Sequence, residues 1–497
     1  MNIATLLEMS AETMGDRIAY GSLDNGLSFH QLLGLSRSAA ATFGSASAEH
    51  VALLDESNPA VPVALFGAAL AGVPYAPISY RLAPDAITAL LGRLGRAALV
   101  AGDRYVYQPA EGGPVIASQD LLTPTVTDGL ILPELVDPDG VAVLIFTSGT
   151  TGTPKAAVLR HRNLVSYVLG TVEFAGAGDD EATLVSVPPY HIAGVASILS
   201  AVYAGRRVVQ LPNFTAENWI TKVLAENISH AMVVPTMLTR IVEVLARDGV
   251  KLPSLRHLSY GGGRMPLPVI EQALELLPDV SFVNAYGLTE TSSSICLLGP
   301  DDHRAAFESS DPAIRRRIGS VGRPIDGIEV SIRDSEGEPT KSGVSGEVWV
   351  RGSQVAGEYA GVANGSAESG WFATNDGGYL DADGYLFLEG RLDDVIVRGG
   401  ENLSPGEIED ALLAHNIIAD AAVIGAPDVE WGEKVVAFIV SRDPGLTAAD
   451  VRTWVTSRLR SSRAPQDVHF VESLPYNDTG KLLRRELRRW LDDPHHV

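Results

Sequence analysis

The segment VAVLIFTSGTTGTPK, residues 141–155, joins a short apolar run to a loop rich in threonine and glycine. The run 141–146 has the length and composition of a buried strand. Glycines in the loop permit backbone turns that side chains would forbid. Its hydroxyl and N–H groups can surround a polyphosphate, and Lys155 adds positive charge. A strand and a phosphate-binding loop are therefore predicted, without the GxxxxGK[ST] spacing of Walker A. The predicted phosphate ligands are Thr147, Ser148, Gly149, Thr150, Thr151, Gly152 and Lys155.

Strand-like and helix-like segments alternate after this loop. This spacing suits βαβ units, so we expect an α/β fold with parallel-rich sheets and flanking helices. Ligand loops should then lie at the carboxyl ends of the strands. The strand-like segments are 184–187, 207–211, 230–234, 255–260 and 281–284, and the helix-like ones are 192–203, 215–226, 236–247 and 267–276.

The pattern changes twice further along the chain. Segments 329–333 and 347–351 alternate like half-buried strands between glycine turns, so a β-rich subdomain is expected at about 319–392. After Arg391 the helix-like segments 404–415 and 447–460 mix with strand-like 421–424, 435–440 and 468–471. This tail has enough elements for a small α+β domain of its own.

Composition excludes several classes of function. The 497 residues suggest two to four domains. With 61 acidic and 38 basic residues the net charge is −23, which disfavours nucleic-acid partners. The single cysteine, Cys296, rules out an internal disulfide framework or a cysteine-cluster metal site. The first residues lack a signal-peptide pattern, and prolines and glycines interrupt the most apolar stretch, 61–78. We therefore expect a cytoplasmic protein without stable membrane insertion.

A second candidate motif, NAYGLTE at 284–290, follows a strand directly. Tyr286 offers a flat face on which a base could stack. Thr289 can donate to an anionic oxygen, and Glu290 can hold Mg²⁺ between phosphates. Taken alone, Tyr286 is equally explained as a core residue and Glu290 as a solvated charge.

Two further patterns suit a nucleotide. Gly261, Gly262 and Gly263 end a strand and would let a planar ligand lie against backbone, although a loose turn explains them as well. Asp376 could accept hydrogen bonds from a ribose diol with Arg391 adding a contact, or the two could form a structural ion pair.

Lys481, on a glycine turn near the C-terminus, could reach a reaction centre, and His191 could line a substrate channel. The following Arg484, Arg485, Arg488 and Arg489 are typical of a solvated helix face. The sequence contains neither an HExxH nor a GxSxG motif, so zinc and serine hydrolase chemistry gain no support.

Together these motifs resemble the adenylate-forming superfamily of acyl-CoA synthetases, adenylation domains and luciferases, over nearly the whole chain and in the family's order. The resemblance implies a large N-terminal domain, 1–392, and a mobile C-terminal domain, 393–497, joined at the hinge residue Asp393. It implies that ATP, Mg²⁺ and CoA are used to convert a carboxylic acid to acyl-AMP and then to a thioester. Lys481, Thr289 and Glu290 would be catalytic, with Glu290 also holding the metal.

The resemblance also implies the remaining binding residues. Asn284, Tyr286, Asp376, Arg391 and the triple glycine 261–263 would bind the nucleotide, and His191 and Gly287 the acid. Arg398, Gly399 and Gly400 would contact CoA.

The chain departs from the family pattern in three places. Asn375 stands where the family usually has glycine, Val397 stands where it usually has lysine, and residues 188–194 contain no aspartate for an α-ammonium group. Amino acid activation is thus disfavoured. A stand-alone adenylating enzyme that serves a carrier protein, and a non-catalytic nucleotide-binding homologue, remain alternatives.

Overall fold

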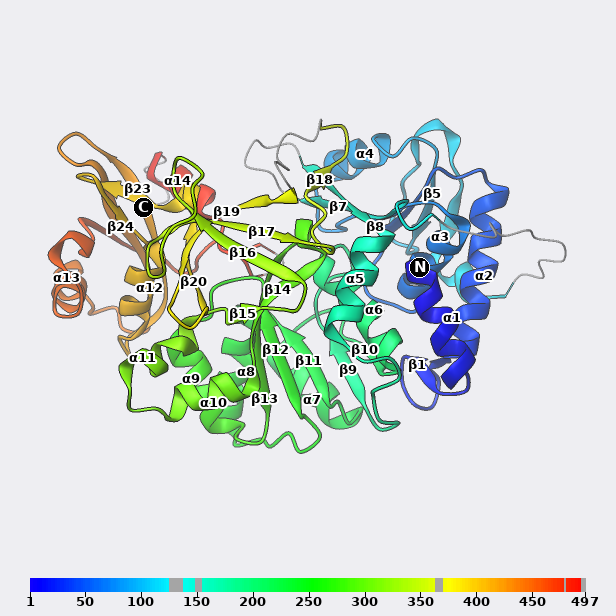
Figure 1. The fold of residues 1–497 in the computed structure, drawn as a ribbon, viewed down its shortest axis with the longest axis horizontal. Helices are drawn as coiled ribbons and strands as arrows, with labels where there is room; N and C mark the ends of the chain where they lie inside the picture. The colour runs from blue at the N-terminus through cyan, green and yellow to red at the C-terminus, as the bar shows by residue number, and fades with distance from the viewer. Residues whose placement is uncertain (125–136, 148–153, 363–369, 478–479, 493–497) are drawn as a thin grey trace.

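The structure is a computed structural model that describes residues 1–124, 137–147, 154–362, 370–477 and 480–492. Within these ranges the chain forms four β-sheets that follow one another across an elongated molecule (Figure 1). The predicted α/β class, with parallel-rich sheets and a smaller C-terminal α+β part, is confirmed. The helices are α1 (Ile3–Met14), α2 (Phe29–Ser45), α3 (Ala60–Ala71), α4 (Pro84–Gly92), α5 (His161–Thr171), α6 (Ile192–Ala204), α7 (Ala216–Ala225), α8 (Pro235–Asp248), α9 (Leu267–Leu276), α10 (Pro300–Glu308), α11 (Pro312–Arg315), α12 (Pro405–Leu413), α13 (Ala448–Thr456) and α14 (Arg484–Asp492).

The phosphate-loop strand lies inside a seven-stranded sheet. Residues alternate between its two faces: Val51 and Leu53 pack with α1, α2 and α3, whereas Ala52 and Leu54 pack with α4. The apolar stretch around α3 is thus buried in the core. In spatial order the strands are β18 (Glu358–Tyr359), β8 (Lys155–Arg160), β7 (Val141–Thr147), β4 (Tyr75–Pro77), β3 (His50–Leu54), β5 (Ala97–Ala101) and β6 (Val115–Ala117).

A nine-stranded sheet contains the predicted βαβ series. Six neighbouring strands, from β13 to β1, run parallel, and α7, α8 and α9 contribute to the same core cluster. Helix α9 has the bounds that the sequence predicted. The order is β15 (Arg323–Pro324), β14 (Ser293–Leu298), β13 (Ser281–Leu288), β12 (His257–Gly261), β11 (His230–Val233), β9 (Ala182–Val185), β10 (Arg207–Gln210), β1 (Ile18–Tyr20) and β2 (Leu27–Ser28).

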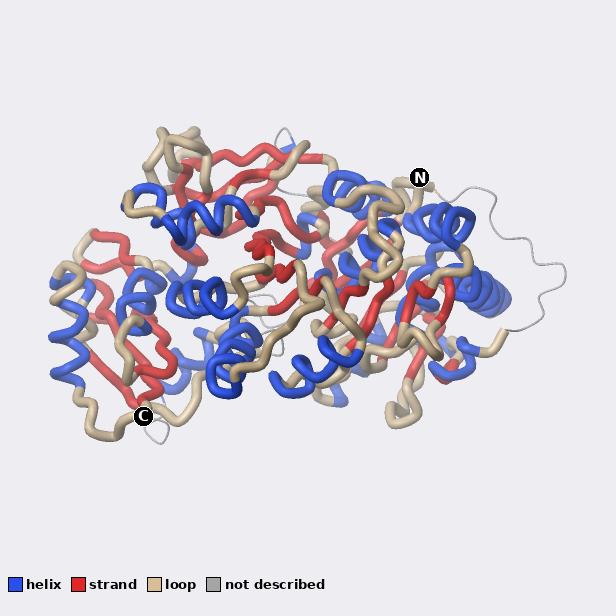
Figure 2. Tube along the Cα trace, turned by 90° about the horizontal axis from the view of Figure 1, so that it is seen from below, coloured by secondary structure: helices blue, strands red, loops and turns tan. Residues whose placement is uncertain are grey.

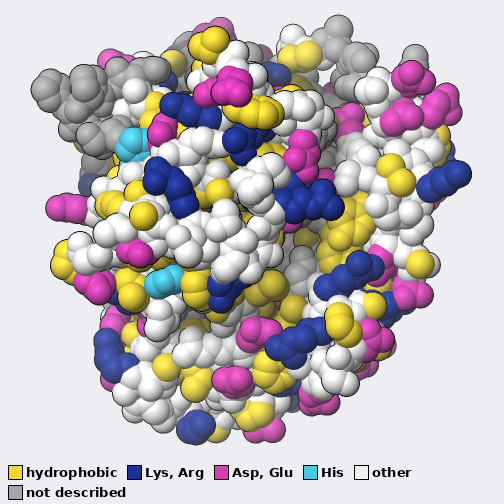
Figure 3. All heavy atoms as spheres, turned by 90° about the vertical axis from the view of Figure 1, so that its left-hand side faces the viewer, with side chains coloured by type: hydrophobic (Ala, Val, Ile, Leu, Met, Phe, Trp, Pro, Cys, Tyr) yellow, Lys and Arg dark blue, Asp and Glu magenta, His cyan; other side chains and the backbone are white. Residues whose placement is uncertain are grey.

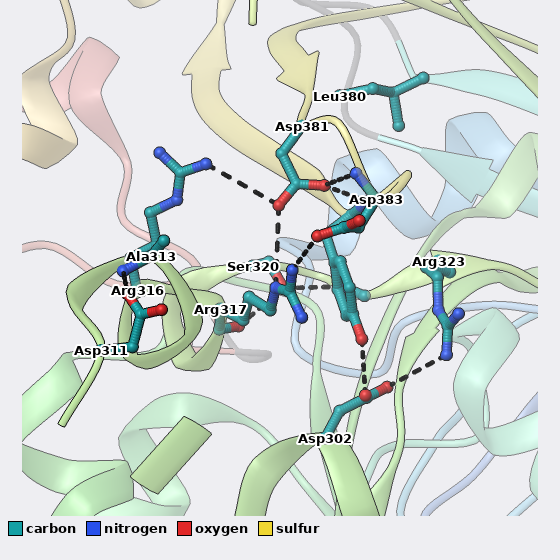
Figure 4. A network of polar contacts seen from close by, with 12 residues as sticks. Asp302, Asp311, Ala313, Arg316, Arg317, Ser320, Arg323, Leu380, Asp381 and Asp383 are labelled. Atoms are coloured by element: carbon teal, nitrogen blue, oxygen red, sulfur yellow. Dashed lines mark hydrogen bonds and ion pairs between the residues drawn. The ribbon is translucent and has the colours of Figure 1, made fainter. Parts of the chain in front are cut away.

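An antiparallel four-stranded sheet forms the β-rich part, in yellow in Figure 1. The turn of its last hairpin is clasped to the short 3₁₀ helix η4 (Arg316–Gly319), where Arg317 pairs with Asp383 (Figure 4). The buried carboxylate of Asp381 accepts the N–H groups of Asp383 and Tyr385, both at 2.9 Å. These contacts anchor the hairpin. The strands are β16 (Ile328–Arg333), β17 (Gly346–Gly352), β19 (Phe372–Leu380) and β20 (Leu386–Arg391).

The C-terminal segment builds a sheet at one end of the molecule, away from the N-terminus (Figure 1, Figure 2). One face packs on α12 and α13 and the other on α14. Figure 3 looks onto this end and shows Lys and Arg side chains interspersed with Asp and Glu. The strands are β21 (Ile396–Arg398), β22 (Glu401–Leu403), β23 (Ile418–Asp428), β24 (Gly432–Ser441) and β25 (Asp467–Phe470). None of the helices in the described ranges is both long and apolar enough to cross a membrane.

Two buried histidines should make the folded chain sensitive to mild acid. His303 is fully buried, its Nδ1 lies 2.8 Å from the Gly299 carbonyl oxygen, and its Nε2 lies 2.9 Å from the Tyr260 hydroxyl. This pairing suits the neutral ring with a proton on Nδ1. Burial lowers the pKa of His303 to about 4, and that of the buried His161 also to about 4.

Because both folded-state pKa values lie below the usual 6.5, the unfolded chain binds these protons first. The stabilisation is complete above pH 6.5 and is lost as pH falls toward 4. We expect the free energy of unfolding to fall by about 2 kcal/mol per histidine between pH 7 and pH 5. Urea unfolding at both pH values measures this. The variant His303→Gln should show a shallower pH dependence, and an unchanged slope would contradict the assignment.

Candidate active site

The two ends of the phosphate loop are held together by the β7–β8 hairpin. Thr147 and Lys155 are opposite each other in the antiparallel register, and the Thr147 hydroxyl donates to the Lys155 carbonyl oxygen at 3.4 Å. The Lys155 side chain is exposed at this point. Ser148, Gly149, Thr150, Thr151 and Gly152 lie outside the described residues, so their phosphate contacts stay a prediction.

The predicted ribose pair is brought together by the β19–β20 hairpin. Asp376 faces Arg391 in the register, with 3.0 Å between Asp376 Oδ1 and Arg391 Nε. The Tyr286 hydroxyl donates to Asp376 Oδ2 at 2.6 Å. Burial raises the pKa of Asp376, and the Arg391 and Lys481 charges and the Tyr286 hydroxyl oppose that shift. A buried carboxylate held by two donors is preorganised to accept hydrogen bonds from a diol.

Tyr286 is a core residue, as one of the two sequence interpretations had it, and it also forms a hydrogen bond in the site. Its ring packs in a core cluster with Ile295 and Cys296, while its hydroxyl reaches Asp376. The neighbouring Gly287 lies at a bulge of β13, where a Cβ would collide with the Ser293 carbonyl oxygen. Asn284, earlier on the strand, donates to the Ser320 carbonyl oxygen at 2.9 Å. Base stacking on Tyr286 stays a prediction.

Thr289 and Glu290 lie on the 3₁₀ turn η3 (Thr289–Thr291), directly after β13, and both are half-buried. Tyr359 donates its hydroxyl to Glu290 Oε1. Burial and the Glu290 carboxylate raise the pKa of Tyr359, so the hydroxyl keeps its proton and remains a donor. Among the described residues no cluster of three His, Cys, Asp or Glu side chains could hold a metal. Glu290 offers carboxylate oxygens, the kind of ligand that Mg²⁺ prefers.

The turn that carries Lys481 lies against the strand end of the triple glycine. Gly480 has φ +68° and packs so closely on α8 that a side chain there would collide with Thr236 Oγ1. The segment before α8 also borders the glycines, because Cβ atoms at Gly262 and Gly263 would lie 3.8 Å from Val234 Cγ1 and 3.6 Å from Pro235 Cγ. Gly261 itself is required by close approach to the Ala285 carbonyl of β13. The C-terminal turn thus reaches the large lobe beside the predicted nucleotide residues.

Lys481 is exposed at the start of the segment that leads into α14. Burial and the Arg391 guanidinium lower its pKa, whereas Asp376 and Asp394 oppose the shift. Its backbone N–H donates to Asn477 Oδ1 at 2.8 Å, which fixes the turn. The pKa of Lys481 therefore depends on the charges of Asp376 and Arg391.

The residue that departs from the family glycine, Asn375, has φ +61°, which glycine adopts freely and asparagine tolerates. Its side-chain Nδ2 donates to Asp393 Oδ2 at 3.1 Å. Asp393 lies on η6 (Leu392–Asp394), between the last strand of one sheet and the first strand of the next. The predicted hinge residue is thus bonded to the neighbour of the ribose aspartate.

Of the predicted acid residues, Gly287 lies beside Tyr286, whereas His191 and the predicted CoA residues lie on other elements. His191 immediately precedes α6, and its ring lies 4.6 Å from that of Tyr190, which in turn packs edge-on against Tyr80. Arg398 packs on Trp431 and donates to the Ser462 carbonyl oxygen at 2.5 Å, and the Gly399 N–H donates to the Trp431 carbonyl oxygen at 2.8 Å. Gly399 and Gly400 both have positive φ in the β21–β22 turn.

Two features were missed or misjudged at the sequence level. Tyr359 was not a candidate, because a two-residue strand has no periodicity to signal it. The solvated face predicted for α14 is wrong for Arg484, whose half-buried side chain pairs with Glu409, whereas Arg488, with Nη2 2.9 Å from Asp394 Oδ1, keeps an exposed side chain. Partners so distant along the chain leave no local pattern.

Comparison with known proteins gives consistent matches. The model of the AMP-binding enzyme family matches residues 7–360, and that of the AMP-binding enzyme C-terminal domain matches 407–481. A fatty acid–[acyl-carrier-protein] ligase from Streptomyces coeruleorubidus is 32% identical over 483 residues, covering 91% of this chain and 89% of the relative. A 2-succinylbenzoate–CoA ligase from Bacillus cereus is 33% identical over 354 residues, 70% of each chain.

Solved structures of one enzyme allow a comparison of shape. The o-succinylbenzoate CoA synthetase of Bacillus subtilis, in complex with its acyl-adenylate intermediate, matches with a TM-score of 0.85 at 26% identity, over 97% of both chains. A double mutant of that enzyme bound with a product analogue, OSB-NCoA, matches with a TM-score of only 0.70, over 97% of this chain and 98% of the mutant. The overall arrangement of this chain is therefore more similar to that of the adenylate complex than to that of the mutant with the product analogue.

Proposed function

Because this chain belongs to the AMP-binding enzyme family, we propose that it is an ATP-dependent ligase that converts a carboxylic acid to an acyl adenylate and then transfers the acyl group to CoA. In the first reaction a carboxylate oxygen attacks the α-phosphorus of ATP, and the bond to pyrophosphate breaks. In the second, the CoA sulfur attacks the acyl carbon and AMP leaves. Activation is needed because AMP is a far better leaving group than the oxygen of a free carboxylate.

The residues of this chain would contribute mainly position and charge. Asp376 and Arg391 would hold the ribose, and Lys155 the phosphates. Lys481 would lie between the acid carboxylate and the α-phosphate, where negative charge accumulates. Glu290 would hold Mg²⁺, which supplies positive charge between the phosphates when bound.

The observation that carries this proposal is the position of the C-terminal turn. The charges of Asp376 and Arg391 affect the pKa of Lys481, and its neighbour Gly480 packs on Thr236 of the large lobe. Lys481 lies on a turn of the C-terminal segment, which forms a sheet of its own. Movement of that segment would take the lysine out of the site and make space for the thiol. The two TM-scores, 0.85 and 0.70, support such a change of arrangement between the two reactions.

The test is acid-dependent exchange of radiolabelled pyrophosphate into ATP over a panel of acids, followed by AMP formation with CoA. The panel should contain 2-succinylbenzoate, simple aryl acids and fatty acids of graded length, as the two relatives suggest. We expect exchange with at least one acid and CoA-dependent AMP release with the same acid. Tight nucleotide binding without exchange on any acid would instead indicate a non-catalytic homologue.

A carrier protein is the second candidate acceptor. The relative with 91% coverage of this chain is a ligase of fatty acids to acyl-carrier protein. In addition, Val397 replaces a lysine that the family commonly has after the hinge. Exchange that gains nothing from CoA, together with thioester on an added phosphopantetheinylated carrier, would establish this acceptor in place of CoA.

A further inference from the structure

Tyr359 connects residues of the active site that are far apart in the sequence. It lies on β18, opposite Ala157 of β8. Its hydroxyl donates to Glu290 Oε1, and the Lys155 Nζ atom lies 5.5 Å from the centre of its ring. One side chain thus contacts both the carboxylate assigned to Mg²⁺ and the lysine assigned to phosphate.

The backbone before Tyr359 also holds Glu290. The N–H groups of Ala356 and Gly357 donate to the Glu290 carbonyl oxygen at 2.8 and 3.2 Å. On the other side, Glu358 forms a two-pronged ion pair with Arg160 of β8, with distances of 2.8 and 3.0 Å. Segment 356–359 therefore joins η3, which follows β13 of one large sheet, to β8 of the other, where its last two residues form the edge strand β18.

We propose that Tyr359 is a positioning residue for the ATP–metal complex: its hydroxyl orients the Glu290 carboxylate toward the metal, and its ring holds Lys155 at the base of the phosphate loop. The inference rests on the proposed function, since that function assigns Glu290 and Lys155 their ligands. Hydrogen bonds to a metal ligand fix its orientation. An aromatic face attracts an ammonium group. Because the two contacts use different parts of the side chain, substitutions can separate them.

The experiment compares Tyr359→Phe, which removes only the hydroxyl, with Tyr359→Leu, which removes the ring as well. Mn²⁺ replaces Mg²⁺ as a paramagnetic probe, and electron paramagnetic resonance measures its affinity for the full chain saturated with a non-hydrolysable ATP analogue. Affinity for the analogue is also measured without metal. We expect Tyr359→Phe to weaken Mn²⁺ binding by about 10–100-fold and to leave metal-free nucleotide binding unchanged. Tyr359→Leu should also weaken metal-free binding, by about 2–5-fold.

Tyr385→Phe is the matched control. Tyr385 likewise donates its hydroxyl to a carboxylate, Asp302 Oδ1 at 2.6 Å. This contact lies at the turn of the β19–β20 hairpin, away from the predicted nucleotide residues. Tyr385→Phe should leave both affinities unchanged. Wild-type Mn²⁺ affinity in Tyr359→Phe, or an equal loss in Tyr385→Phe, would overturn the role of the Tyr359 hydroxyl. Failure of the unaltered chain to bind the nucleotide with Mn²⁺ would count against the proposed function itself.

Discussion

Replacing Lys481 with alanine should reduce acid-dependent pyrophosphate exchange by about 100–1,000-fold, the loss expected when a preorganised donor to a transition-state charge is removed. The charges of Asp376 and Arg391 act on the pKa of Lys481, and the neighbouring Gly480 packs against Thr236. Negative charge builds between the acid and the α-phosphate, where the ammonium group of Lys481 would offset it. The decrease should appear in kcat rather than in the KM for ATP.

The same variant should use supplied acyl adenylate almost normally. Thioester formation from chemically prepared acyl-AMP and CoA should stay within about threefold of the unaltered enzyme, since Lys481 serves only the first reaction. Arg485→Ala is the control, because it removes an exposed positive charge four residues away that pairs only with Glu486 among the contacts described. Equal losses in both half-reactions would show that the two reactions do not use Lys481 differently.

Replacing Asp376 with alanine should raise the KM for ATP by about 10–100-fold, the range for losing hydrogen bonds to a charged acceptor. The change also leaves the Arg391 guanidinium and the Tyr286 hydroxyl without their buried partner, which will destabilise the fold. Asp376→Asn keeps the shape of the side chain and is therefore the second variant. Both should weaken ATP binding more than they slow the chemical step.

Deoxynucleotides make this prediction specific to the ribose. The unaltered enzyme should prefer ATP over 2′-deoxy-ATP and 3′-deoxy-ATP, and both Asp376 variants should lose that preference. Asp381→Asn is the control for stability alone, since it alters a buried carboxylate at the other end of the same hairpin. Retained discrimination in the Asp376 variants would mean that another residue binds the ribose.

The fold was predictable to the extent that its elements have their own local pattern. The run 141–146 follows from its length and apolar composition, and the helix Leu267–Leu276 from its helix-like pattern, because the side chains of each are buried in the core. The two-residue strand β18 does not, because its position depends on the edge of β8 and on Glu290 rather than on its own residues. The antiparallel pairing of β8 with β7 likewise does not follow from the residues of either strand alone.

The candidate site was predictable where chemistry dictates residue type. Asp376, Arg391 and Lys481 were proposed from charge and spacing, and the structure brings them into one electrostatic group. The sequence could not identify the tyrosines that orient two carboxylates of the site. These are Tyr286, which donates to Asp376, and Tyr359, which donates to Glu290. Tyrosines are also common in cores, so their residue type does not distinguish a packing role from an orienting one.

The hydrogen bond between Asn375 and Asp393 has a consequence for movement of the C-terminal segment. The side-chain amide of Asn375 donates this hydrogen bond to Asp393, and Asn375 directly precedes Asp376. The backbone of Asn375 has φ +61°. If Asp393 is the hinge and Asp376 holds the ribose, as the family resemblance implies, a rotation that moves the Asp393 side chain would break this hydrogen bond next to the nucleotide. Departure of AMP and return of the small domain would then be coupled events rather than independent ones.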